Sequence, residues 1–265
     1  MKETLVQCVR EAGALLRQHF GRVRHISVKE NQSSIVTEAD VAAETLIAEI
    51  IRRRFPEHNL LGEESGLQWR GSNFTWVIDP LDGTSNFAAG LPWFGVMVAV
   101  LEHARPVLSA MYLPLDDVLY LAERGRGVTR DGEPIALIAA TSLSETLVAY
   151  GMDATADAVQ SERQTQMLRL LASRARNVRL TNCLLDICYT LDGRFGAFVN
   201  QGCKIWDIAP GSLMFAELGA VLTDLQGRPV EFDLSPEGYL RVYPVIGAKP
   251  ELHRAVLEAA RDAGF

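Results

Sequence analysis

The chain has 265 residues, 48% of them hydrophobic and 22% charged, which is the profile of a globular protein large enough to bury a core. Lysines and arginines number 26 against 33 acids, so the formal net charge is −7 and the chain is a poor candidate for a general nucleic-acid binder. No run approaches the ~20 apolar residues of a membrane span, so we expect no membrane association.

The cysteines and the first residues indicate an intracellular protein. Cys8, Cys183, Cys188 and Cys203 include no CxxC pair and are typical of reduced, buried thiols. The opening residues MKETLVQCVREAG scatter charges among apolar residues, which is not the pattern of a signal peptide. We therefore expect a cytoplasmic location.

The first half of the chain predicts two helices followed by short strands. Apolar residues recur at helical spacing from Leu5 to Phe20 and again from Thr37 to Arg54, and residues 23–29 between them alternate like a strand. Short apolar runs separated by turn residues then indicate a largely antiparallel sheet. These predicted strands lie at 60–62, 74–79, 94–101, 107–113 and 118–122.

The second half of the chain alternates strands and helices, the pattern of a sheet covered by helices. Strands are predicted at 146–150, 177–181, 195–199, 220–223 and 240–247, and helices at 157–173, 183–191, about 207–218 and from Pro250. The hydrophobic pattern changes from the first kind to the second near ATSLSE at 140–145. We expect a single domain over 1–265, with subdomains of about 1–142 and 143–265.

The stretch WVIDPLDGTSNF at 76–87 carries an apolar strand into two acids, Asp79 and Asp82. Residues i and i+3 point to opposite faces of a regular strand. Because Pro80 lacks a backbone donor, we expect the strand to end here, and in a turn the two carboxylates can converge.

The residues that follow these acids suggest an anion site. Thr84 or Ser85 would begin a helical turn whose free N–H groups point toward the same place, a geometry that favours phosphate. The alternative is an ordinary Asx-type turn at Asp82-Gly83, and this stretch alone does not choose between the two.

Three further acid-bearing segments lie at predicted ends of strands or helices. Glu63 and Glu64 in GEES follow a short strand, Asp207 in WDIAPG lies near a helix N-terminus, and Asp40 in TEAD completes a capping box. Taken singly, GEES is better explained as a solvated loop and Asp40 as a helix cap, and a helix cap is also a common role for a residue placed like Asp207. Together with Asp79, they suggest one shared carboxylate cluster.

The ligand chemistry of such a cluster indicates a hard cation. No histidine or cysteine accompanies the acids, and all-oxygen ligands favour Mg²⁺, with substrate phosphate completing its coordination. Several carboxylates holding more than one cation can clamp the attacking and leaving oxygens of a phosphate ester.

These segments resemble the inositol monophosphatase family of Mg²⁺-dependent, lithium-sensitive phosphatases, which is related to fructose-1,6-bisphosphatase. The matching blocks are SIVTEAD, GEES, DPLDGTSNF and WDIAPGSLMFAELGAVLTDLQG, and their order and approximate spacing hold over nearly the whole chain. The resemblance implies an α/β fold built as a layered αβαβα sandwich, two or three Mg²⁺ ions per site, and a homodimer.

The resemblance also implies metal ligands. Glu63, Asp79 and the backbone carbonyl of Leu81 would hold the first Mg²⁺, while Asp79, Asp82 and Asp207 would hold the second. A third, weaker ion would lie by Glu63.

Further roles follow from the same resemblance. Thr84 would pair with Asp40 beside the nucleophilic water, and Glu63 would help to position or deprotonate that water. Glu64 would support the metal ligands from behind, and Lys29 would lie near the metals. The reaction implied is direct attack of metal-activated water on phosphorus, with no covalent enzyme intermediate.

The substrate contacts implied by the resemblance lie around the phosphate and the leaving alcohol, and they comprise Asp82, Gly83, Thr84, Ser85, Asn182, Asn200 and Asp207. Two of them depart from the animal-type pattern. Asn200 stands where those enzymes have a glutamate that contacts the sugar alcohol, and Asn182 lies in a junction that is often rich in glycine and alanine.

Several functions remain open at this stage. The expected substrate is myo-inositol monophosphate, with histidinol phosphate, fructose 1,6-bisphosphate and 3′-phosphoadenosine 5′-phosphate as alternatives. An alternative of another class is a non-catalytic module that binds metal or phosphate and acts as a regulator.

Overall fold

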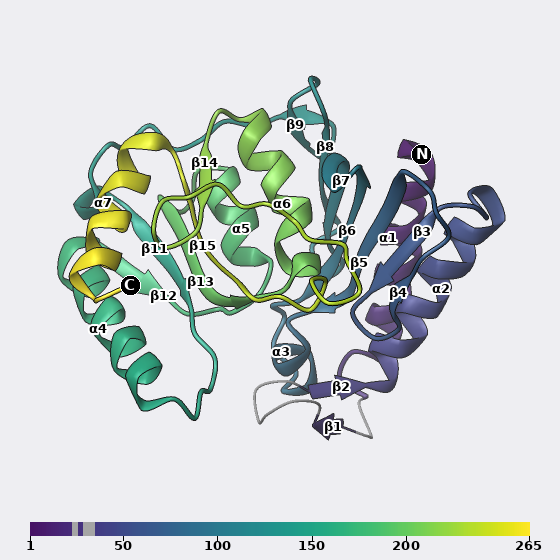
Figure 1. The fold of residues 1–265 in the computed structure, drawn as a ribbon, viewed down its shortest axis with the longest axis horizontal. Helices are drawn as coiled ribbons and strands as arrows, with labels where there is room; N and C mark the ends of the chain where they lie inside the picture. Colours follow the sequence, from purple (N-terminus) through teal and green to yellow (C-terminus); the bar gives the residue numbers. More distant parts are fainter. Residues whose placement is uncertain (23–25, 29–34) are drawn as a thin grey trace.

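The computed structural model describes residues 1–22, 26–28 and 35–265. Within these residues, α-helices and sheets alternate in layers (Figure 1). The helices are α1 (Lys2–His19), α2 (Glu38–Arg54), α3 (Thr84–Ala88), α4 (Ala158–Arg174), α5 (Leu185–Leu191), α6 (Ile205–Glu217) and α7 (Pro250–Asp262), with one 3-10 turn at Leu143–Glu145. None of these helices combines the length and the apolar character that a bilayer crossing requires.

An eight-stranded sheet has the strand order β10-β9-β8-β7-β6-β5-β3-β4, and only the β3–β5 pair is parallel. The prediction of a largely antiparallel sheet in the first half is confirmed. Its strands are β3 (Asn59–Gly62), β4 (Gly66–Gln68), β5 (Phe74–Asp82), β6 (Gly95–Glu102), β7 (Arg105–Leu113), β8 (Val118–Glu123), β9 (Val128–Arg130) and β10 (Glu133–Pro134). A separate two-stranded sheet pairs β1 (Ile26–Val28) with β2 (Ile35–Thr37) in antiparallel fashion.

A five-stranded sheet in the second half has the order β12-β11-β13-β15-β14. Its strands are β11 (Leu147–Gly151), β12 (Asn177–Arg179), β13 (Ala197–Cys203), β14 (Val221–Thr223) and β15 (Tyr243–Ala248). Because β11, β12 and β13 are parallel, with α4 and α5 as the crossovers, their carboxyl ends lie along one edge. In open α/β sheets such edges are where ligands bind.

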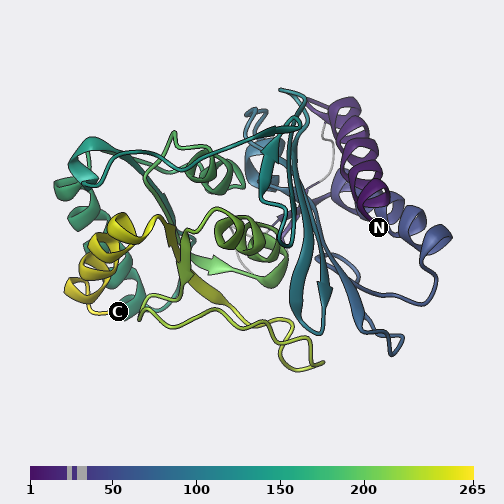
Figure 2. The ribbon, with the colours of Figure 1, turned by 90° about the horizontal axis from the view of Figure 1, so that it is seen from above.

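The layers follow from which helices pack on which sheet. α1 and α2 cover one face of the eight-stranded sheet, α5 and α6 lie between the two sheets, and α4 and α7 cover the outer face of the five-stranded sheet (Figures 1 and 2). Three separate apolar cores fill the spaces between these layers. The predicted αβαβα sandwich is therefore confirmed.

One prediction about β5 is wrong. The strand does not end at Asp79 but continues through Pro80 to Asp82, with a shift in register against β6. Asp79 pairs with Met97 and Asp82 with Gly95, so two residues of β5 stand opposite one residue of β6. This is a β-bulge, and a bulge tolerates a proline because it interrupts the ladder of hydrogen bonds.

The bulge determines where the two acids point. In a regular strand, residues three apart lie on opposite faces, but one extra residue restores them to the same face. Ile78 and Leu81 accordingly both belong to the core beneath α1 and α2. Asp79 and Asp82 therefore share the other face, the face that α6 covers.

The start of α6 also differs from the prediction. We expected a helix from about 207, but the helix begins at Ile205, which makes Pro210 its sixth residue. The reason is a capping interaction, because the backbone N–H of Lys204 donates to Asp207 Oδ2 at 2.6 Å. Asp207 is thus the third residue of α6, and its carboxylate folds back over the helix N-terminus.

Candidate active site

Asp79, Asp82 and Asp207 meet between β5 and α6. Each of the three offers a carboxylate oxygen that lies within 4.8 Å of the oxygens of the other two, which makes them a possible metal-binding group. Asp79 is buried, at 1% exposure, while Asp82 and Asp207 are half-buried. A backbone amide holds each side chain: Leu81 N–H donates to Asp79 Oδ1 at 3.1 Å, Leu184 N–H donates to Asp82 Oδ2, and Lys204 N–H donates to Asp207 Oδ2.

Packing three carboxylates together favours their protonated forms when no cation is present. Burial, followed by the charges of Glu63, Asp82 and Asp207, raises the pKa of Asp79 well above its usual range. Burial also raises the pKa of Asp82 to about 7, and burial together with the charge of Asp82 raises the pKa of Asp207 to about 7. A divalent cation supplies the charge that these groups lack, and their all-oxygen donor set fits Mg²⁺.

Thr84 lies beside this cluster, at the first position of α3. Its hydroxyl oxygen is 3.0 Å from Asp40 Oδ1 and 2.9 Å from the carbonyl oxygen of Leu81. Asp40 is fully buried, and its other oxygen accepts from the backbone N–H and the hydroxyl of Thr37 at 2.8 and 2.6 Å. Asp40 therefore caps α2 and orients Thr84 at the same time, which reconciles the cap and the site interpretations.

The GEES segment forms the turn between β3 and β4, and its backbone is held by a buried acid that the sequence reasoning missed. Glu44 of α2 is 4% exposed, and its two carboxylate oxygens accept from the N–H groups of Glu64 and Ser65, both at 2.8 Å. The available signal was an acid four residues after Asp40, on the apolar face of α2.

The remaining predicted residues lie as follows. Glu63 and Glu64 are half-buried, and the Glu63 charge contributes to the raised pKa of both Asp79 and Asp82. Gly83 has φ of +88° and precedes α3, and Ser85 is exposed on that helix. Lys29 lies outside the described residues.

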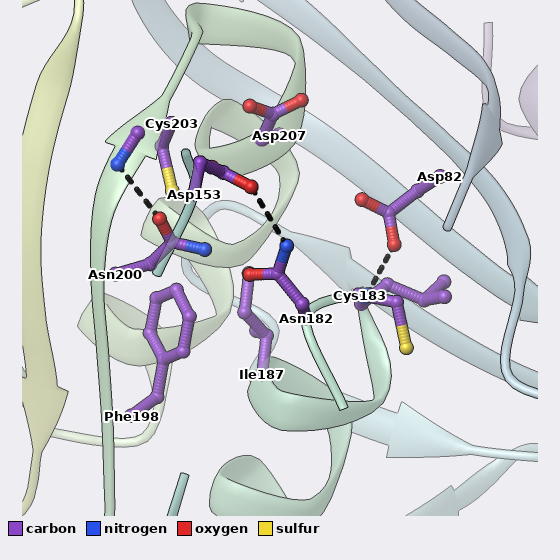
Figure 3. A pocket seen from close by; sticks show the side chains of 11 residues that line it. Asp82, Asp153, Asn182, Cys183, Ile187, Phe198, Asn200, Cys203 and Asp207 are labelled. Atoms are coloured by element: carbon purple, nitrogen blue, oxygen red, sulfur yellow. Dashed lines mark hydrogen bonds between the residues drawn. The ribbon is translucent and has the colours of Figure 1, made fainter. Parts of the chain in front are cut away.

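A cavity of about 120 Å³ adjoins the carboxylates, on the side of the five-stranded sheet (Figure 3). Asn182 and Asn200 both line it. Asp153, which the sequence reasoning did not single out, lines it too. Asp153 and Asn182 follow the carboxyl ends of β11 and β12, and Asn200 lies in β13 opposite Gly151, the last residue of β11. They therefore lie at the edge where a parallel sheet gathers its ligand contacts.

Comparison with known proteins decides the family. The family model described as "Inositol monophosphatase family" matches residues 1–264. The chain belongs to the inositol monophosphatase family. Its members are metal-dependent phosphatases, and the oxygen cluster of Asp79, Asp82 and Asp207 is a group that could bind metal here. The resemblance drawn from the sequence blocks is therefore confirmed.

Relatives within the inositol monophosphatase family carry different names. A fructose-1,6-bisphosphatase/inositol-1-monophosphatase of Thermotoga maritima is 35% identical over 84% of this chain and 84% of its own length. A Nus factor SuhB of Pasteurella multocida is 30% identical over 97% and 94%. The crystal structure of the extragenic suppressor protein suhB of Bartonella henselae superposes with a TM-score of 0.89 over 99% and 98%, at 27% identity.

Proposed function

We propose that this protein hydrolyses a small phosphate monoester in the presence of Mg²⁺, with myo-inositol monophosphate as the expected substrate, giving inositol and phosphate. The observation that carries the proposal is the convergence of Asp79, Asp82 and Asp207 beside the Thr84–Asp40 pair. Family membership supports phosphatase activity, and the specific ester belongs to the proposal.

The ligand assignment follows the family resemblance. Glu63, Asp79 and the Leu81 carbonyl would hold one Mg²⁺, Asp79, Asp82 and Asp207 a second, and Glu63 a weaker third. Bound Mg²⁺ would lower the pKa of a coordinated water and neutralise charge on the phosphate. Asp79 is suited to bridge two ions because it is the buried central member of the cluster.

Thr84 and Asp40 would guide the attacking water. The Thr84 hydroxyl can donate to Asp40 and accept a hydrogen bond from a water on its free lone pair. Attack of that water on phosphorus forms one P–O bond and breaks the bond to the leaving alcohol, which takes up a proton. Glu63 would help to position or deprotonate the water.

The phosphate itself would be held by the Gly83–Ser85 backbone and by the metals. Asp82 and Asp207 would lie next to it as metal ligands. Glu64 would support Glu63 from the same turn, and Lys29 would lie near the metals. Asn182 and Asn200 would contact the leaving alcohol, since both line the adjoining cavity.

The Glu44 contacts yield a prediction about metal affinity. Glu44→Gln leaves one acceptor oxygen in place of two, so one amide of the Glu64-Ser65 turn loses its partner and Glu63 shifts. The Mg²⁺ concentration for half-maximal activity should rise by about tenfold, with most of the kcat recovered at saturating Mg²⁺. Activity measured against Mg²⁺ concentration tests this.

The control for Glu44→Gln is Glu49→Gln on the exposed side of the same helix, where the carboxylate pairs with Arg53 at 3.1 Å. It should leave the Mg²⁺ requirement unchanged. An equal rise in both variants would assign the effect to the net charge of α2 and not to the turn.

The proposed activity itself is tested by measuring phosphate release from a panel of esters, with Mg²⁺ and with a chelator. The panel contains inositol 1-phosphate, histidinol phosphate, fructose 1,6-bisphosphate and 3′-phosphoadenosine 5′-phosphate. We expect Mg²⁺-dependent release that is highest with inositol 1-phosphate. Absence of release from every ester would refute the proposed activity.

A second candidate function is a non-catalytic regulatory module that binds metal or phosphate. The name Nus factor of the Pasteurella multocida relative favours it. Mg²⁺ binding measured by calorimetry, without release of phosphate from any ester, would support this alternative.

Other properties belong to the same proposal. A cytoplasmic location is supported by four free, buried cysteines. A homodimer, sensitivity to lithium, and the subdomain boundary near 142 stay predictions from the family resemblance and from the change in sequence rhythm.

A further inference from the structure

The cavity beside the carboxylates has more polar groups than phosphate hydrolysis uses. Asp82 and Asp207 line it, but both belong to the proposed metal site. Asp153, Asn182 and Asn200 also line it and are left to face whatever alcohol the phosphate is attached to. Figure 3 shows Asp153 joined to Asn182 by a hydrogen bond, with Asp82 and Asp207 around the same space.

The carboxylate of Asp153 is fixed in place by its neighbours. Its Oδ1 accepts from Asn182 Nδ2 at 3.0 Å. A Cβ on Gly202 would stand 2.5 Å from its Oδ2, so only a glycine there allows so close an approach. On the neighbouring strand, Asn200 Oδ1 accepts from Gly202 N–H at 2.8 Å. Asp153, Asn182 and Asn200 thus form an ordered polar wall of the cavity, with the Asp153 carboxylate between the two asparagine side chains.

The charge of this wall selects against one class of leaving group. Among the described residues that line the cavity, none is lysine, arginine or histidine, and Asp153 is the acid not assigned to metal. A second phosphate on the leaving alcohol would therefore meet a carboxylate and no cation, and juxtaposed like charges weaken binding. A carboxylate instead accepts hydrogen bonds from hydroxyl or ammonium groups on the leaving alcohol.

The size of the cavity also restricts the leaving alcohol. At about 120 Å³ it is well below the roughly 300 Å³ at which pockets begin to enclose drug-sized ligands. The enclosed part suits a compact ring or short chain and is too small for a nucleoside.

We propose that Asp153 is a specificity-determining residue that restricts the substrate to monophosphates of compact alcohols with hydroxyl or ammonium donors and no second phosphate. The inference rests on the proposed phosphatase function and narrows its substrate class. Asp153 accepts a hydrogen bond from a hydroxyl or ammonium group of a favoured leaving alcohol, and it repels the second phosphate of a bisphosphate substrate.

The test compares kcat/KM for inositol 1-phosphate and for fructose 1,6-bisphosphate in the wild type, in Asp153→Asn and in Asp153→Glu. Asparagine has the same shape and still accepts from Asn182, but carries no charge. Asp153→Asn should raise the bisphosphate-to-monophosphate ratio by about tenfold, equivalent to ~1.4 kcal/mol. Asp153→Glu retains the charge and should keep the ratio low. Equal melting temperatures show that the variants are folded.

The matched control is Asp157→Asn, four residues along the chain. Asp157 is exposed and caps α4 by accepting from the backbone N–H groups of Val159 and Gln160. Asparagine is an equally good cap, so this variant removes the same charge without disturbing the helix. The substrate ratio should stay at the wild-type value.

The outcomes distinguish a failure of the Asp153 role from a failure of the proposed phosphatase function. Phosphate release with an unchanged ratio in Asp153→Asn, or a wild-type preference for the bisphosphate, overturns the role of Asp153 and leaves the phosphatase proposal standing. If the wild type releases phosphate from neither ester nor from the rest of the panel, the phosphatase proposal fails and this inference fails with it.

Discussion

Asp79→Asn is expected to lower Mg²⁺-dependent phosphate release by about a thousandfold or more, because the proposed site loses the carboxylate that would bridge two ions. An asparagine can offer one neutral oxygen in place of two charged ones, so it cannot balance two divalent cations. The measurement is kcat/KM for inositol 1-phosphate at saturating Mg²⁺.

The same substitution should have the opposite effect on the metal-free fold. Asp79 is 1% exposed and surrounded by the charges of Glu63, Asp82 and Asp207, so neutralising it removes repulsion. In a chelator, Asp79→Asn should melt at or above the wild-type temperature, and Mg²⁺ should stabilise the wild type more than the variant.

Asp233→Asn, in an exposed loop, serves as the control and should leave both activity and Mg²⁺ stabilisation intact. Lower stability of Asp79→Asn in the chelator, with normal activity in Mg²⁺, would make Asp79 a structural turn residue and not a ligand.

The second large effect concerns pH. Burial raises the pKa of both Asp82 and Asp207 to about 7, against 3.8 for an ordinary carboxyl. Below about pH 4, each group is protonated in the folded and unfolded states and contributes nothing. Between about pH 4 and 7, the unfolded chain loses these protons while the folded metal-free protein keeps them, so the free energy of unfolding falls as pH rises. The loss, of the order of a few kcal/mol, is complete above about pH 7.

Mg²⁺ should cancel this loss because it takes the place of the protons. The stabilisation that saturating Mg²⁺ provides over a chelator should therefore grow from almost nothing near pH 4 to a few kcal/mol above pH 7. Denaturant unfolding at a series of pH values, with and without Mg²⁺, measures it. A Mg²⁺ effect of the same size at every pH would contradict the interpretation of Asp82 and Asp207 as a cation site.

The hydrophobic periodicity predicted a largely antiparallel sheet in the first half and a sheet covered by helices in the second, and the family resemblance implied that they form one layered sandwich. The sequence also placed Asp79, Asp82 and Asp207 in one cluster from strand and helix ends, and the structure brings their oxygens within 4.8 Å. Their roles as metal ligands stay a proposal. Local patterns suffice for this much because strand ends and helix caps are local features.

What the sequence did not predict depends on contacts between distant segments. The bulge in β5 exists only against its partner β6, so the residues of β5 alone suggested a strand end at Pro80. Glu44 reaches a turn 20 residues further on, and Asp153, after β11, reaches Asn182, after the adjacent strand β12. The position of Glu44 on the apolar face of α2 indicates only burial, and the partner of each acid is a segment that only the fold brings near.

The single extra residue in β5 also decides which changes of sequence the protein can accept. Asp79 and Asp82 keep a common face as long as the bulge is kept, whichever apolar side chain stands at 81. Loss of the bulge without a change in length would turn Asp82 toward the apolar core beneath α1 and α2, where a lone carboxylate is costly. This part of the chain should therefore accept apolar exchanges at Leu81 but exclude changes that straighten the strand.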